Sequence, residues 1–166
     1  MAIPEDFHVI VGDFNDGFVE IVAEAVAEAF DPRQRLRVQG TSEADRILAM
    51  ADERPVDLFV LFLNNVTFGQ WGRSLEADSF VKALMLVRHL KGVHRRPIIA
   101  TAAFPADFLY EDIAIRVGAD CFFRMPFDMK AFTKAVRELF PERASQATDR
   151  RRTHLSAWAG SNGFKA

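Results

Sequence analysis

Three polar side chains, Asp13, Asn15 and Asp16, follow the first strongly apolar segment of the chain. Carboxylate and amide oxygens in such a cluster are ligands for hard cations such as Mg²⁺ and Ca²⁺. A calcium-binding loop that starts at Asp13 fails, because Gly17 would take a ligand position and Phe18 the position that needs glycine for a sharp turn. We therefore favour a polar turn after a strand, in which Asp16 caps the next helix.

Other catalytic or metal-binding arrangements find no support in the residue types. The single cysteine, Cys121, excludes an intrachain disulfide and a thiolate metal cluster, and the four histidines lack zinc-ligand spacing. No Ser-His-Asp or Cys-His arrangement can be argued, and the Gly-x-Gly-x-x-Gly fingerprint of dinucleotide sites is absent. We therefore expect a protein that is not an enzyme and has no resident cofactor, with Mg²⁺ at Asp13 as the one metal left open.

The composition is that of an ordinary globular domain. The chain has 166 residues, of which 49% are hydrophobic and 27% charged, and its formal net charge is -2. This balance excludes whole-chain disorder and offers no basic field for nucleic acid. No segment reaches the length of a membrane span, and the acidic N-terminus does not resemble a signal peptide. We expect a cytoplasmic protein whose core is rich in phenylalanine, since there are 16 Phe and one Tyr.

Five strand-like segments alternate with five segments of helical periodicity. Six consecutive apolar residues at 58–63 favour a central strand covered on both faces, and polar alternation at 35–40 favours an edge strand. A capping box of Ser42 and Asp45 is predicted for the second helix, and Asp128 is predicted to cap the last. Alternation of this kind predicts an α/β fold with a doubly wound, flavodoxin-like, five-stranded parallel sheet. The strands are expected at 7–13, 35–40, 58–63, 97–101 and 121–124, and the last three helices at 78–90, 106–117 and from 128.

The order of these motifs resembles the receiver domain of bacterial two-component response regulators, the CheY-like (βα)5 fold. The resemblance covers about residues 7–140 and implies a part in phosphorelay signal transduction. Its most specific element is Gly118-Ala119-Asp120 followed by Met125-Pro126-Phe127, which is similar to the family's Gly-Ala-Asp and Lys-Pro-Phe. It also rests on Val9-Ile10-Val11-Gly12-Asp13, Pro55-Val56-Asp57-Leu58 and Arg96-Pro97-Ile98-Ile99-Ala100.

The family's phosphorylation pocket is incomplete in this sequence. The resemblance implies two carboxylates for Mg²⁺ after the first strand, and here Asp13 keeps one while Phe14 replaces the other. Phe62 stands at the position of the phosphorylated aspartate, and Met125, before Pro126, at that of the lysine. An apolar pair at these positions would exclude a phosphoryl group. We interpret the chain as a degenerate receiver, or pseudo-receiver.

The remaining pocket positions depend on the register of the strands. Counting from Pro97 places Ala102 at the family's hydroxyl position, with Thr101 one residue early. A slip of two residues would bring Asn64 to the acceptor position, but asparagine is not a nucleophile under ordinary conditions. We favour an ordinary loop residue there.

Three aromatic residues are candidates for interaction. Phe122 matches the family's aromatic switch position on the fifth strand. Phe68 and Trp71 lie in a long connection at 64–77, where they either anchor a partner or fold back over the pocket as a lid or core plug. The last two helices correspond to the family's dimer or output face, which would make a homodimer.

The composition changes after the last helix. We divide the chain into a receiver-like domain at 1–141 and a polar, basic, flexible tail at 142–166. Three consecutive arginines at 150–152 are too few for stable binding to a membrane or a phosphate backbone, so a solubilising tail is the preferred interpretation.

Three functions remain for this sequence. The leading hypothesis is a signalling module that contacts a histidine kinase or an output protein independently of aspartyl phosphorylation. The second is a divergent phosphorelay receiver with an unusual acceptor such as Asp16. The third is a sensor with a small-ligand site under the loop at 64–77.

Overall fold

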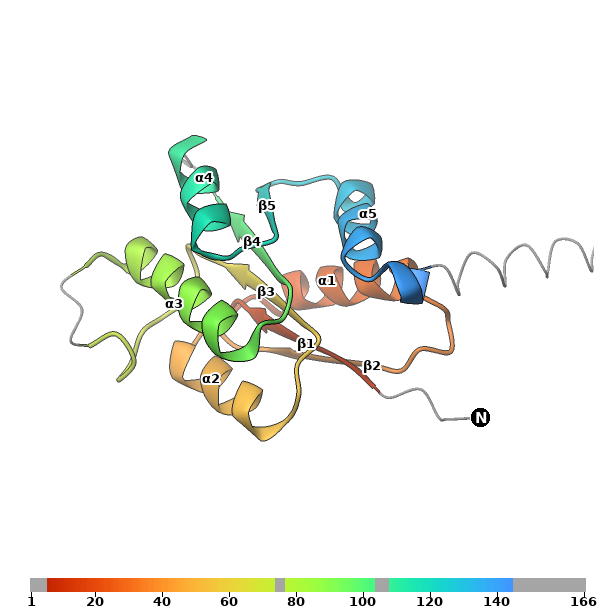
Figure 1. The fold of residues 1–166 in the computed structure, drawn as a ribbon, viewed down its shortest axis with the longest axis horizontal. Coiled ribbons are helices and arrows are strands. Elements are labelled where there is room, and N and C mark those ends of the chain that lie inside the picture. Colours follow the sequence, from red (N-terminus) through yellow and green to blue (C-terminus); the bar gives the residue numbers. More distant parts are fainter. Residues whose placement is uncertain (1–5, 74–76, 104–107, 145–166) are drawn as a thin grey trace, which may run out of the picture.

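The structure, a computed structural model, describes residues 6–73, 77–103 and 108–144. Strands and helices alternate regularly through these residues (Figure 1). The strands are β1 Phe7–Gly12, β2 Leu36–Gly40, β3 Leu58–Phe62, β4 Ile98–Ala102 and β5 Cys121–Arg124. The helices are α1 Asp16–Ala29, α2 Ala44–Glu53, α3 Ser79–His94, α4 Phe108–Val117 and α5 Met129–Leu139.

The strands form one parallel sheet in the order β2-β1-β3-β4-β5. The prediction that 58–63 contains the central strand is confirmed, since β3 lies in the middle of the sheet and four of its five residues are buried. β2 is an edge strand, as its polar alternation predicted. The doubly wound, flavodoxin-like architecture is therefore confirmed.

The two faces of the sheet carry separate hydrophobic clusters. We call the cluster under α1 and α5 the α1–α5 core, and the cluster under α2, α3 and α4 the α2–α4 core. The α1–α5 core is rich in phenylalanine: the ring centroids of Phe7 and Phe30, and those of Phe7 and Phe140, lie 4.9 Å apart. Edge-to-face contacts of this kind add to the stabilisation from buried area.

Of the three predicted helix caps, one is present and two are wrong. The Asp128 carboxylate accepts a hydrogen bond from Lys130 N, as predicted. Asp78, at the predicted start of the third helix, is also a cap, and its carboxylate accepts from Val81 N. The cap of α1 is Asn15, whose side chain accepts from Gly17 N at 2.9 Å, and not Asp16.

The capping box predicted for α2 does not form. The helix begins after Glu43, which makes no side-chain capping bond. The Asp45 carboxylate instead accepts from the backbone of Gln70 and Trp71, both at 2.7 Å. Asp45 therefore binds backbone N–H groups 25 and 26 residues away and not the predicted local partner, Ser42.

Within the described ranges, no helix is both long and apolar enough to cross a bilayer. The helical conformation resumes at 141–144, directly at the predicted domain boundary. The rest of the predicted tail, including the three arginines, lies outside the described residues.

Candidate functional site

The carboxyl ends of the central strands bring Asp13, Phe62 and Thr101 to one level of the sheet. Phe62 pairs with Thr101, and Gly12, the residue before Asp13, pairs with Leu61. Paired residues of neighbouring parallel strands share a face of the sheet. Phe62 packs on the α1–α5 core, which identifies the face. We call these three residues the crevice row.

Phe62 fills the middle of the crevice row. Its ring centroid lies 5.5 Å from that of Phe18, a buried residue of α1. Met125 packs against the same α1–α5 core, and the peptide bond between Met125 and Pro126 is cis. The apolar side chains at the predicted acceptor and lysine positions are therefore part of the hydrophobic packing under α1.

Asp13 is a buried carboxylate with one satisfied oxygen. Its residue is 2% exposed, and its Oδ1 accepts from Asn15 N at 3.2 Å and from Asn65 Nδ2 at 3.0 Å. Among the described residues its Oδ2 has no hydrogen-bond partner. A buried acceptor without a partner carries a desolvation cost.

Thr101, and not Ala102, stands level with Phe62. Its residue is fully buried, and its hydroxyl has no hydrogen-bond partner in the described part of the chain. Ala102 pairs with Arg124, and its carbonyl accepts from Met125 N at 2.9 Å. Counting from Pro97 placed Thr101 one residue before the family's hydroxyl position. In the sheet, the Thr101 side chain nevertheless lies beside Phe62, the predicted acceptor position.

The other predicted pocket residues lie at the rim. Phe14 is 67% exposed, an unusual state for so large an apolar side chain, and Asp16 is exposed in the first turn of α1. Asn64 Oδ1 accepts from Ala103 N at 2.7 Å and so joins the end of β3 to the end of β4. The crevice row itself contains one carboxylate.

The donor set does not fit a hard divalent cation. Mg²⁺ takes near-octahedral oxygen coordination, and the second carboxylate of the family pattern is replaced by Phe14, which points to solvent. Across the described ranges, no three His, Cys, Asp or Glu side chains come together as a metal site.

Asn65 is the residue that sequence reasoning undervalued. Its amide holds the Asp13 carboxylate across 52 positions of sequence. The signal available was the pair Asn64-Asn65 directly after the central strand. From the sequence we consider only Asn64, as a replacement acceptor or an ordinary loop residue.

The aromatic candidates lie on the other face of the sheet. Phe122, Phe68 and Trp71 all pack against the α2–α4 core. The ring centroids of Phe68 and Trp71 are 6.0 Å apart, and that of Trp71 is 5.8 Å from the His89 ring of α3. The two side chains therefore pack on the α2–α4 core, on the face of the sheet opposite to Phe62, and not over the pocket.

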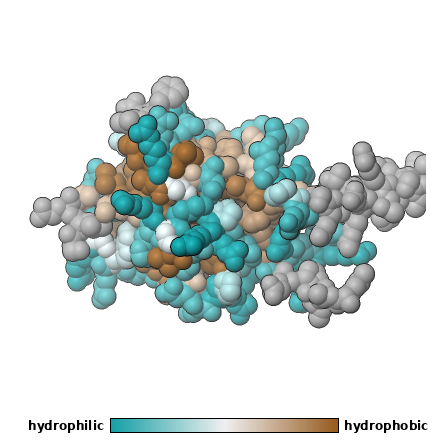
Figure 2. Space-filling view, viewed as in Figure 1, coloured by the Kyte–Doolittle hydropathy of each residue, from teal (hydrophilic) through white to brown (hydrophobic). Residues whose placement is uncertain are grey.

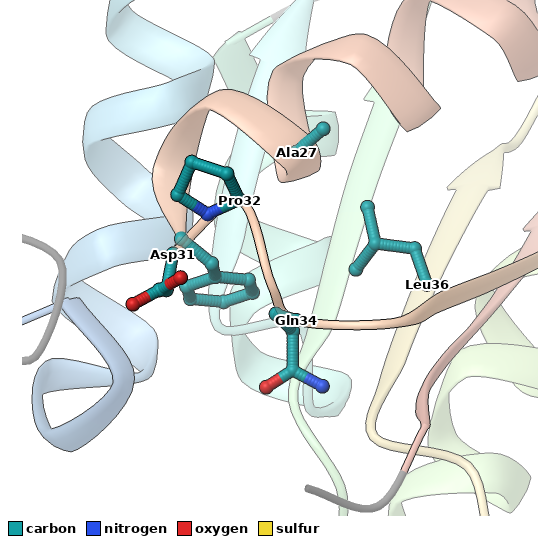
Figure 3. A pocket seen from close by; sticks show the side chains of 6 residues that line it. Ala27, Asp31, Pro32, Gln34 and Leu36 are labelled. Atoms are coloured by element: carbon teal, nitrogen blue, oxygen red, sulfur yellow. The ribbon is translucent and has the colours of Figure 1, made fainter.

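A small cavity lies at the opposite end of the strands, between the end of α1 and the start of β2 (Figure 3). Its volume is about 40 Å³, which suits ordered water and not a metabolite. The residues that line it are Ala27, Phe30, Asp31, Pro32, Gln34 and Leu36.

The burial of Cys121 affects its ionisation. The pKa of the thiol is raised above its ordinary value of 9.0, chiefly because burial disfavours the thiolate. The negative charges of Asp120 and Glu138 raise it further. Burial and the neighbouring carboxylates therefore favour the neutral thiol over the thiolate.

Comparison with known proteins identifies the fold through structure alone. No protein-family model matches the chain, and neither does any curated protein. Among solved structures, the receiver domain of NtrX from Brucella abortus superposes with a TM-score of 0.59 at 19% identity, covering 81% of this chain and 98% of that one. An orphan response regulator of H. pylori gives a TM-score of 0.59 at 14% identity, covering 82% of this chain and 98% of that one.

A structure of NtrX from Brucella abortus in complex with ADP superposes with a TM-score of 0.60 at 17% identity. The match covers 90% of this chain and 28% of that one, so the chain spans less than a third of that protein. At such identities the likeness concerns the path of the backbone. Together with the parallel sheet and its strand order, it shows that the chain has the receiver-domain fold of response regulators.

Proposed function

We propose that the chain is a two-component receiver module that signals through protein–protein contact, without phosphorylation of an aspartate. The observation that carries this proposal is the packing of Phe62 against Phe18, level with Thr101. Phosphoryl transfer needs a nucleophile, a counter-charge and, in receivers, a metal ion. A phenyl ring supplies no nucleophile, and Met125 supplies no positive charge.

The rim of the crevice supports a contact function. Phe14 exposes 67% of its surface next to the crevice row. Exposed aromatic side chains are frequent anchors at protein interfaces. A histidine kinase or an output protein is the kind of partner that the fold suggests, and α4 with α5 is the surface for a homodimer. No catalytic step and no cofactor enters this function.

Phosphorylation with acetyl phosphate and Mg²⁺, followed by intact-mass spectrometry, tests the proposal. We expect no acyl phosphate on the wild-type chain. The matched control is the triple variant Phe14→Asp, Phe62→Asp, Met125→Lys, which restores the carboxylates and the lysine of the family pattern. Phosphorylation of a folded triple variant would show that the assay works. Stoichiometric acyl phosphate on the wild type would overturn the proposal.

One observation favours a second candidate, a divergent phosphorelay receiver. The Asp13 Oδ2 atom has no partner among the described residues, and Asp16 exposes a carboxylate nearby in sequence. In this case acetyl phosphate modifies the wild-type chain, and the modification is lost in Asp16→Asn. Retention of the modification in that variant would exclude Asp16 as the acceptor.

A further inference from the structure

An open groove runs between the outer side of α3 and the loop that precedes it. Its volume is about 710 Å³. Met85 and Val93 of α3 are 39% and 58% exposed there, and Figure 2 shows hydrophobic surface among hydrophilic surface on the side of α3 and α4. The lining residues are Gln70, Trp71, Gly72, Met85, Arg88, His89, Gly92 and Val93. None of these residues is acidic.

Within the described part of the chain, Gly92 has no packing role. A Cβ atom at this position would meet no atom within 4 Å, although other glycines such as Gly12 have a neighbour at 2.7 Å. A glycine inside a helix is destabilising relative to alanine. At this exposed position in the lining of the groove, glycine leaves space for the close approach of another chain.

The charges of α3 and α1 are opposite. Between Ser79 and His94 the helix α3 contains three lysines and arginines and no Asp or Glu. Lys91 pairs with Asp120 at 2.8 Å, so Arg88 is the permanent charge that lines the groove.

Helix α1 carries carboxylates and no Lys or Arg. Its acidic residues recur every four positions and are all exposed, so they form one stripe, and Ile21 beside them is 42% exposed. We call this surface the α1 stripe: Asp16, Glu20, Glu24 and Glu28, with Ile21.

We propose that the groove on α3 binds the α1 stripe of a second copy of this chain. The positive charge of Arg88 in the groove complements the carboxylates of the α1 stripe, and the exposed side chain of Ile21 would become buried against the apolar residues of the groove. Helices α1 and α3 cover opposite faces of the sheet (Figure 1). The contact is therefore heterologous, and each added copy leaves one groove and one stripe free at the ends of the assembly.

Sedimentation velocity at increasing protein concentration tests the proposal. We expect self-association at low salt and weaker association at high salt, because screening shortens the range of the charges. Arg88→Glu and Glu24→Arg should each weaken association by at least about tenfold, since each places like charges across the contact.

Mixing gives the decisive result. In a one-to-one mixture of Arg88→Glu and Glu24→Arg, the intact stripe of one variant faces the intact groove of the other, and the two reversed charges attract each other across the second contact. We therefore expect the mixture to associate although neither variant does so alone. Gly92→Leu should also prevent association, because it fills the groove without changing the charge. Circular dichroism of each variant confirms that the monomer is folded.

Glu53→Arg, an exposed charge reversal at the end of α2, is the matched control and should leave association unchanged. A wild-type chain that stays monomeric at low salt would overturn the proposal. So would a mixture that stays monomeric, or association that responds to Glu53→Arg and not to Arg88→Glu. These results do not depend on phosphorylation, so the assay distinguishes this proposal from that of a module independent of phosphorylation.

Discussion

The side-chain amide of Asn65 donates a hydrogen bond to Asp13 Oδ1 at 3.0 Å and thereby joins the loop after β3 to the end of β1. Asp13 is 2% exposed, so water cannot readily replace this donor. A buried carboxylate that loses a donor keeps its desolvation cost without compensation. The stability of the crevice therefore depends on a residue outside the family's catalytic set.

Asn65→Ala should lower the free energy of unfolding by about 1.5–3 kcal/mol, the range for a hydrogen bond to a charged group. Urea unfolding followed by circular dichroism measures the change. Asn64→Ala is the control: its Oδ1 accepts from Ala103 N at an exposed position, so we expect a smaller loss of about 0.5–1.5 kcal/mol. A larger loss for Asn64→Ala would contradict this ranking.

Asp45→Ala should release the loop that carries Trp71. The Asp45 carboxylate accepts from two backbone N–H groups of that loop, and the variant should lower stability by about 1–3 kcal/mol. In a Trp158→Phe background, the emission of Trp71 should shift to longer wavelength as the ring gains water. Asp52→Ala, at a side chain 76% exposed, should leave the emission unchanged. An unshifted spectrum in Asp45→Ala would show that the core contacts of Trp71 hold the loop without this carboxylate.

Thr101→Val should leave the free energy of unfolding unchanged or raise it by up to about 1 kcal/mol. The buried hydroxyl has no partner among the described residues, and valine preserves the shape of the side chain. Thr133→Val is the matched control, because the Thr133 hydroxyl donates a hydrogen bond to the Ala25 carbonyl at 3.4 Å. This variant should therefore be less stable than the wild type. Thermal and urea unfolding measure the stability of both variants. A loss of stability in Thr101→Val equal to that in Thr133→Val would mean that the Thr101 hydroxyl has a partner.

The Cys121 thiol should make the folded chain less stable at alkaline pH. Its pKa in the folded state is raised above the ordinary value of 9.0, chiefly by burial and then by Asp120 and Glu138. The stabilisation is therefore present below pH 9.0 and is lost as the pH rises toward the folded-state pKa. Comparison of unfolding curves for wild type and Cys121→Ala isolates this contribution. A wild-type curve that gains stability relative to Cys121→Ala above pH 9 would contradict the assignment.

The sequence was sufficient for elements whose causes are local. The unbroken apolar run of β3 predicted a strand covered on both faces, and the polar alternation of β2 predicted an edge. Asp78 and Asp128 were readable as helix starts because their capping bonds reach only three and two residues ahead. The order of these elements then limited the fold to a parallel, doubly wound sheet.

Contacts between distant residues could not be predicted in the same way. The Asp45 carboxylate had a local candidate in Ser42, but loop N–H groups 25 residues away bind it more favourably. The pairing of Asn65 with Asp13 spans 52 positions. Counting along β4 favoured Ala102, whereas the register of the sheet sets Thr101 beside Phe62. Each of these outcomes depends on the three-dimensional packing of neighbouring strands.

The ring of Phe62 belongs to the same apolar packing that holds α1 on the sheet. A single Phe62→Asp change would open a void beside Phe18 and place a charge among aromatic rings, so it would weaken the fold before any chemistry could benefit. Under the proposed function, a phosphorylatable site at this level of the sheet therefore requires coordinated changes at several positions. Core packing and pocket chemistry are epistatic at Phe62, because a change that supplies a carboxylate also removes packing from under α1.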